Sequence, residues 1–114
     1  RYVNYNNKGF EFIEPVWWDE WNSIEQLIWT DCMEDAEIKY CELIEQGSNP
    51  QQARSVLPNS LKAEIVVKAN IREWRHIFTL RCNPAAHPQM VALMKPVLAE
   101  FKERFPILFD DIEG

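Results

Sequence analysis

The amino-acid sequence predicts an α+β fold in which long helices pack on a small, mainly antiparallel sheet. Apolar residues recur at intervals of three and four over long stretches, which is typical of amphipathic helices. A β-branched run, Ile65–Val67, and an apolar N-terminal segment interrupted by a polar turn supply the strands. With 114 residues, 46% of them apolar, the chain is long enough for one domain and no more, so we expect residues 1–114 to belong to a single domain.

Residues 1–16 are predicted to be extended or irregular. Tyr2, Val3 and Tyr5 precede the polar turn 6–9, and the segment Phe10–Ile13 follows it. Two such segments separated by a turn favour a β-hairpin, which would provide antiparallel strands.

The next segment, Val16–Glu45, has the apolar spacing of a helix. Pro15 precedes it, and Gly47 offers a natural stop. Its apolar positions form one stripe, which consists of Trp17, Trp21, Ile24, Ile28, Cys32, Ala36, Tyr40 and Leu43. A stripe of this kind usually faces the core, so we expect this side of the helix to be buried.

Two shorter elements follow. Asn49 and Pro50 predict the start of a short helix that ends before Pro58, because Asn caps helices and Pro is tolerated in the first turn. Leu61–Ala69 then has the β-branched centre of a strand.

The remainder of the chain is predicted to be helical. Asn70 is placed to cap a helix over Ile71–Arg81. A last helix spans His87–Arg104, with a kink or a break expected at Pro96, because proline removes a backbone donor and crowds the preceding turn. Pro106 is expected to end this helix and leave a short acidic tail.

Charge and cysteine content disfavour several classes of protein. The formal net charge is −6, which disfavours binding to a long nucleic-acid backbone. No run of about 18 apolar residues is present, so no membrane span is expected, and no signal peptide is visible. Three cysteines without a Cys-x-x-Cys pair argue against a disulfide framework and favour reduced thiols in a cytoplasmic protein.

A cationic cluster in the middle of this acidic chain indicates an anionic ligand. Its members are Arg54, Arg72, Arg75, His76 and Arg81. Arg72 and His76 are four residues apart, so they share a helix face and are able to grip one ligand together. Arg81 falls within the apolar side of the same helix, where its guanidinium needs a carboxylate, a phosphate, a polarised carbonyl or the helix's own last carbonyls.

Each of the cationic residues in the helix also has a purely structural interpretation. Arg81 would then cap the C-terminus of its helix. Arg72 and Arg75 would be solvated, or paired with Glu73 or with the acidic first helix. His76 would be a partly buried histidine with a satisfied ring.

No metal site or catalytic motif is evident. The two histidines lie eleven residues apart without matched carboxylates. No glycine-rich phosphate loop and no nucleophile–base pair is present either. If the chain belongs to an enzyme, a bound cofactor is therefore expected to supply the reactive centre.

The segments around the cationic residues closely resemble flavin-dependent thymidylate synthases. The matching pieces are RYVNY at the start, ARSVLP, and the core EIVVKANIREWRHIFTLRC, in the family's order and spacing over nearly the whole chain. The most specific combination consists of Arg54, Pro58, Asn70, Arg72 and the Leu80-Arg81 pair.

The resemblance implies an α+β enzyme of nucleotide biosynthesis, a methyltransferase that makes dTMP from dUMP. Methylenetetrahydrofolate is the carbon donor, NADPH is the reductant and bound FAD carries the electrons. The family forms homotetramers in which each active site is shared between subunits, and it requires no protein nucleophile.

The resemblance also implies which residues contact the flavin. Asn70, Ile71, Arg72 and His76 match positions at which the family contacts FAD. Family members often carry Asn at the position of His76.

Three arginines match positions that contact dUMP, namely Arg1, Arg54 and Arg81. The family's arginine at the position of Arg81 is the one that polarises the uracil ring. Negative charge develops across this ring when its C5 attacks, and a desolvated guanidinium next to the ring carbonyl stabilises that charge.

One family motif, Arg-His-Arg followed by Asn-Glu-x-Ser, is absent, because it lies upstream of the position of Arg1. We therefore expect residues 1–114 to be the C-terminal portion of a single synthase domain, inactive without the N-terminal half. Such a portion is expected to expose apolar area and to be oligomeric, swapped or prone to aggregate.

Two other functions stay open. A non-catalytic helical interaction domain would dock its Trp17–Trp21 face on a protein partner and carry the arginines on its surface. A nucleic-acid binder is the third possibility, and the net charge of −6 disfavours it.

Overall fold

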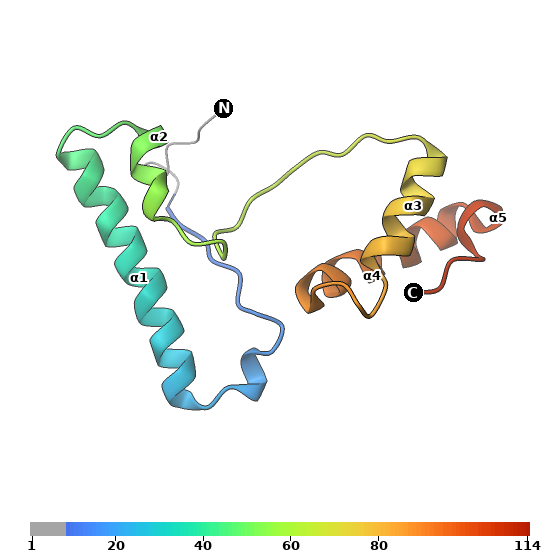
Figure 1. Ribbon diagram of the computed structural model, residues 1–114, viewed down its shortest axis with the longest axis horizontal. Helices are drawn as coiled ribbons and strands as arrows, with labels where there is room; N and C mark the ends of the chain where they lie inside the picture. The colour runs from blue at the N-terminus through green and yellow to red at the C-terminus, as the bar shows by residue number, and fades with distance from the viewer. Residues whose placement is uncertain (1–8) are drawn as a thin grey trace. The chain divides into compact units, whose positions relative to one another are not determined.

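A computed structural model describes residues 9–114, and within that range the chain is helical, without any strand (Figure 1). The prediction of an α+β fold with a sheet is therefore wrong. The chain divides into two compact units, one up to Glu64 and one from Ile65 to Gly114. The elements are η2 (Trp18–Glu20), α1 (Ser23–Glu45), α2 (Pro50–Ala53), η3 (Arg54–Val56), α3 (Ile71–Arg81), α4 (Pro88–Arg104) and α5 (Pro106–Phe109).

The segment predicted as a strand, Leu61–Ala69, is extended but has no neighbouring strand within residues 9–114. One isolated antiparallel bridge joins Leu61 to Phe12, and an ion pair of 2.8 Å joins Lys62 to Glu11 beside it. Beyond the bridge the backbone runs alone, and Ile65 exposes 83% of its surface. β-branched residues favour a strand only when a second strand accepts their backbone hydrogen bonds, and none lies alongside in the described part.

The predicted N-terminal hairpin is tested only in part, since residues 1–8 lie outside the described range. Of its expected second strand, only Phe12 forms a bridge, and its partner is Leu61.

Helix α1 begins at Ser23 and not at Val16, because Asn22 caps it. The Asn22 side chain accepts a hydrogen bond from Glu25 N (2.9 Å), and the Glu25 carboxylate accepts one from Asn22 N (3.4 Å), which is a capping box. Gly47, with φ of 99°, ends the helix as predicted, in the hydrogen-bond pattern of a Schellman motif.

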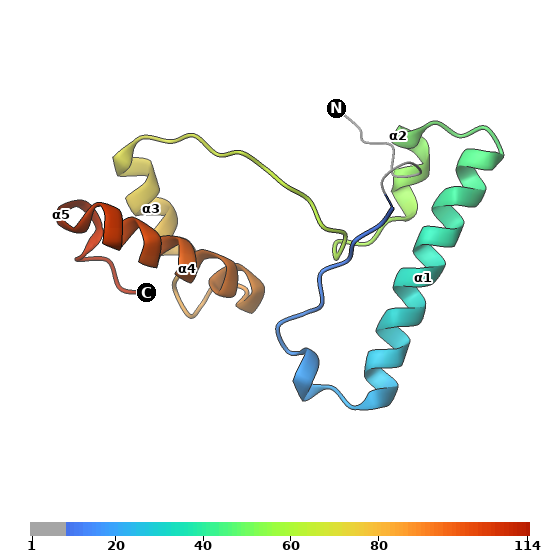
Figure 2. The ribbon, with the colours of Figure 1, turned by 180° about the vertical axis from the view of Figure 1, so that it is seen from behind.

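The apolar stripe of α1 is buried over only part of its length. Tyr40 is fully buried, and its ring meets that of Phe10 edge to face at 5.2 Å. The short helix α2 packs beside this end of α1 (Figure 2). At the other end, Ile24 and Ile28 expose 68% and 64% of their surface. The prediction of a buried stripe is confirmed for the C-terminal half of α1 and wrong for the N-terminal half.

Helices α2 and η3 form as the sequence predicts. The Asn49 side chain accepts from Gln52 N (3.0 Å), and Pro50 occupies the first helical position. Ala53 of this segment is fully buried.

The second unit consists of α3, α4 and α5 around one core. The core residues are Phe78, Cys82, Leu98, Phe109 and Ile112. Aromatic rings dominate this core. The ring centroid of Phe78 lies 5.0 Å from that of Phe101 and 5.8 Å from that of Phe109, and both pairs meet edge to face.

The predictions about proline in this unit hold in part. Helix α4 runs from Pro88 to Arg104 without a break at Pro96, so the break is wrong and the kink stays a prediction. Helix α4 ends before Pro106 as predicted, but Pro106 then starts the short helix α5, where its missing N–H costs nothing. The residues after α5 fold back, and Ile112 enters the core.

Candidate functional site

Helix α3 carries most of the predicted site residues, and Asn70 fixes where it begins. The Asn70 side chain accepts a hydrogen bond from Glu73 N at 2.8 Å, as a helix cap does. Helix α3 therefore begins at Ile71, as predicted. The Ile71 side chain is half exposed.

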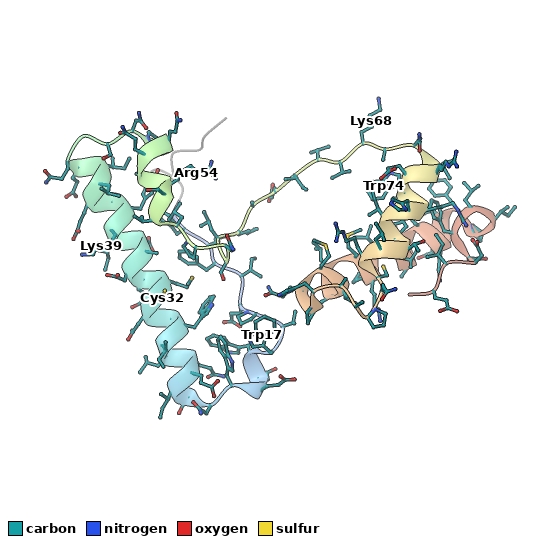
Figure 3. All side chains as sticks on the ribbon, viewed as in Figure 1. Trp17, Cys32, Lys39, Arg54, Lys68 and Trp74 are labelled. Atoms are coloured by element: carbon teal, nitrogen blue, oxygen red, sulfur yellow. The ribbon has the colours of Figure 1, made fainter. Side chains whose placement is uncertain are left out.

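One side of α3 is anchored in the core of the second unit. Phe78 is fully buried, and the ring of Trp74, seen in Figure 3, lies 5.0 Å from that of Phe101 on α4. Since both rings lie on one side of the helix, the opposite side faces solvent.

Arg72 and His76 lie on the solvent side of α3, one turn apart, and both are exposed. Among residues 9–114, neither side chain makes a hydrogen bond or an ion pair. The alternative of a partly buried His76 is wrong. Both groups are exposed, and their joint binding of one ligand stays a prediction.

Arg81 is exposed in the last turn of α3. It lies nine positions after Arg72, and nine positions of α-helix make two and a half turns, so the two side chains leave the helix on opposite sides. Within the described range Arg81 donates no hydrogen bond to the last carbonyls, so a capping role is not observed. The apolar side of α3 does not bury it in this chain.

Arg75, in contrast, has partners within its own unit. Its Nη1 and Nη2 donate to the two carboxylate oxygens of Asp111, each at 2.7 Å, and Nη1 also donates to the Leu108 carbonyl. The hydrogen bond from Arg75 lowers the pKa of Asp111 to about 2, and the same contact raises the pKa of Arg75. The sequence interpretation offered Glu73 or the acidic helix as partners, and both are wrong. Asp111 lies 36 residues away, beyond the reach of any local spacing rule.

The two other predicted arginines do not belong to the described part of the second unit. Arg54 is exposed at the start of η3 in the first unit, so its convergence with Arg81 stays a prediction. Arg1 lies outside the described residues.

A cavity of about 460 Å³ lies beside the Arg75–Asp111 pair in the second unit. Its wall includes Thr79, Cys82, Asn83 and Lys95. Burial raises the pKa of the Cys82 thiol, so the neutral form is favoured at neutral pH. The cavity thus offers polar groups without an activated nucleophile.

Residues 9–114 contain neither a metal-binding group of side chains nor a membrane-spanning helix. No group of three His, Cys, Asp or Glu side chains is arranged to hold a metal ion there. None of the helices in this range combines the length and the apolar character needed to cross a bilayer.

Comparison with known proteins gives a consistent result. A flavin-dependent thymidylate synthase of Geobacter sulfurreducens is 32% identical over 111 residues, which cover 97% of this chain and 47% of that protein. One from Sulfurisphaera tokodaii is 31% identical over 118 aligned residues, 96% of this chain and 45% of that protein. One from Corynebacterium aurimucosum is 39% identical over 69 residues, 60% of this chain and 28% of that protein.

The chain spans about half the length of the curated relatives that it matches from end to end. The family model described as thymidylate synthase complementing protein matches residues 1–107, nearly all of the sequence. With this match, and with relatives that are all named flavin-dependent thymidylate synthase, the chain belongs to the thymidylate synthase complementing protein family.

Proposed function

We propose that this chain forms part of a flavin-dependent thymidylate synthase, which methylates dUMP to dTMP with methylenetetrahydrofolate as carbon donor and NADPH as reductant. Family membership supports the reaction. One observation in the structure carries the proposal: α3 presents Arg72, His76 and Arg81 exposed and without partners in the described range, while Arg75 beside them is satisfied. Exposed cations without acidic partners suit anionic ligands.

The residues at the start of α3 fit FAD. Arg72 and His76 present donors on one face, where the oxygens of a diphosphate can accept. The N-terminal end of the helix adds the positive end of its dipole next to Asn70, and the half-exposed Ile71 offers an apolar contact. When bound, FAD supplies the electron transfer that the reaction needs.

Arg81 is proposed as the catalytic residue. Its guanidinium stays protonated and would sit next to the uracil carbonyl, where negative charge develops as C5 attacks. Because Arg81 is exposed in this chain, the surfaces that desolvate it must come from the bound ligands and from other parts of the enzyme.

Arg1 and Arg54 are proposed to bind dUMP together with Arg81, these two at its phosphate and Arg81 at its uracil ring. Arginine suits this role because its planar fork donates two parallel hydrogen bonds to phosphate oxygens.

The complete site is proposed to need residues that lie outside a single copy of residues 1–114. The chain spans about half of its relatives and lacks the Arg-His-Arg stretch. We propose that it is the C-terminal portion of a synthase domain, completed by the N-terminal half and assembled as a homotetramer. The exposed Ile24, Leu27 and Ile28 of α1 suit burial in such an assembly.

The test is reconstitution with a polypeptide that corresponds to the uncovered half of the Geobacter relative. We expect the mixture to retain flavin, seen by its visible absorbance, and to form dTMP. Arg81→Ala should lower turnover by about 10²-fold or more with the fold intact. Arg104→Ala, an exposed arginine of α4 paired with Glu100 at 2.7 Å, is the control. Full turnover in Arg81→Ala would refute the catalytic role.

The alternative of a non-catalytic interaction domain has one observation in its favour. A hollow of about 340 Å³ is lined by Trp21 and by Ile28 and Trp29 of α1. This function predicts no flavin retention under any reconstitution, and a protein partner that is displaced by a charged substitution at the exposed Ile28. Flavin retention by the mixture decides against it.

A further inference from the structure

We propose that Arg75 is a positioning residue, which locks α3 to the C-terminal segment Pro106–Ile112 so that both ligand-facing sides of α3 are held in place. The inference rests on the proposed function. It separates Arg75 from Arg72, His76 and Arg81, the cations assigned to ligands.

The contact has the geometry of a clamp. Two parallel hydrogen bonds of 2.7 Å join the guanidinium of Arg75 to both oxygens of Asp111. A bidentate arginine–carboxylate pair fixes orientation as well as distance. Arg75 Nη1 also donates to the Leu108 carbonyl, so the clamp holds the segment at two points. Both Nη1 hydrogens and one Nη2 hydrogen of Arg75 are used in these bonds, so the terminal fork is directed at the C-terminal segment.

The clamped segment also completes the core under α3. Phe109 and Ile112, on either side of Asp111, expose only 2% and 7% of their surface. They pack in one cluster with Phe78 of α3 and with Cys82, the residue directly after this helix. Because both apolar packing and the Arg75–Asp111 pair hold this segment, it packs on the helix in one defined orientation. The clamp therefore fixes the rotation of α3 about its own axis.

The helical position of Arg75 explains why this rotation concerns both ligands. By helical geometry, Arg75 leaves α3 about 60° from Arg72 and about 120° from Arg81. It occupies the arc between them on the side that faces the core, where Phe78 lies. A change in how α3 is seated would move the two opposite sides together.

The proposal is tested with a double-mutant cycle in the complete 114-residue chain, reconstituted as above. The variants are Arg75→Gln, Asp111→Asn and the two combined, with Asp110→Asn as the matched control, since Asp110 is exposed and lies next to the clamp without joining it. Flavin retention, dUMP affinity and amide hydrogen exchange of α3 are measured well below the unfolding temperature, where all variants are folded.

We expect each single variant to raise the exchange of α3 by about two- to fivefold. Each should weaken flavin and dUMP binding by similar factors, and the double variant should be no worse than either single one. Arg72→Ala is the reference for direct contact, and it should weaken flavin binding alone. Asp110→Asn should change nothing.

Three results would overturn the proposal. Unchanged α3 exchange in both single variants would show that the clamp does not hold the helix. If the double variant binds dUMP or flavin more weakly than Asp111→Asn alone, Arg75 contacts a ligand directly. A defect confined to one ligand would contradict the coupling of the two sides. If the parent chain binds neither ligand, the proposed function fails, and α3 exchange alone decides whether the clamp exists.

Discussion

Arg72 and Arg81 leave α3 on opposite sides, two and a half turns apart, and neither has a partner among residues 9–114. One ligand lying along one face of the helix cannot contact both. The helix is therefore suited to serve two ligands, or one bent around it, and this agrees with the assignment of FAD to Arg72 and dUMP to Arg81.

Single substitutions should separate these two ligands. In the reconstituted protein, Arg72→Ala is expected to reduce flavin retention and to leave dUMP affinity nearly unchanged, while Arg81→Ala has the reverse effect. Each lost charge-assisted hydrogen bond is worth about 1.5–3 kcal/mol, a change of roughly ten- to hundredfold in affinity. Equilibrium dialysis with each ligand measures it. Equal loss of both ligands in either variant would contradict the separation.

The cap of α3 should contribute to stability by itself. Asn70→Ala removes the acceptor of the hydrogen bond from Glu73 N and is expected to lower the free energy of unfolding by about 1 kcal/mol. Asn70→Asp keeps an acceptor and is the matched control. Urea denaturation followed by circular dichroism measures both. If Asn70→Asp retains stability but loses flavin, the side chain also contacts the cofactor.

The core of the second unit should be sensitive at Phe78. Phe78→Ala deletes a fully buried ring between Phe101 and Phe109 and is expected to cost about 3–5 kcal/mol, enough to unfold a unit of this size. Leu80→Ala, at a neighbouring position that is half exposed, is the control and should cost far less. Similar losses in the two variants would contradict the assigned core.

Acid should release the Arg75–Asp111 clamp. The pKa of Asp111 is about 2 in the folded chain, below its ordinary value of 3.8. A carboxyl group whose pKa is lowered by folding stabilises the fold at pH values above its ordinary pKa. This stabilisation is lost as the pH falls from about 4 towards 2. Asp111→Asn should flatten the pH dependence of the unfolding midpoint in this window. An unchanged profile in that variant would mean that other carboxylates govern acid unfolding.

The cysteines should differ in reactivity towards a thiol reagent at pH 8. Cys82 exposes 3% of its surface, and burial raises its pKa, so its thiolate is scarce as well as covered. Cys32 is exposed on α1 and should react first. Cys82 should react only as fast as the second unit opens. Mass spectrometry of peptides after timed labelling assigns the sites, and fast labelling of Cys82 in the folded chain would contradict its place in the core.

The local elements were predictable from sequence because their signals are local. Asn49 and Asn70 each cap a helix three residues before the amide that they accept from, so a short window contains the whole interaction. The same rule identifies the true start of α1: Asn22 followed three residues later by Glu25 is a capping-box pattern. The hydrophobic spacing of Trp17 and Trp21 led to an earlier start.

The failures concern contacts that join distant parts of the chain. Ile65–Val67 has a strand-forming composition, but a strand also needs a neighbour, and no sequence window contains one. Likewise, nothing local matches Arg75 with Asp111. The exposed side of α3 followed from periodicity, whereas the predicted meeting of Arg54 with Arg81 depends on tertiary structure and stays a prediction.

The extended run Ile65–Val67, which has no neighbouring strand among residues 9–114, has a consequence for handling the protein. Its β-branched side chains are exposed, and backbone groups without a ladder are a template for cross-β growth between molecules. Charged residues bracket the run in the sequence, with Lys62 and Glu64 before it and Lys68 after it. Lys68 is labelled in Figure 3. Such gatekeepers oppose stacking by mutual repulsion, so high salt, which screens them, should favour fibril formation.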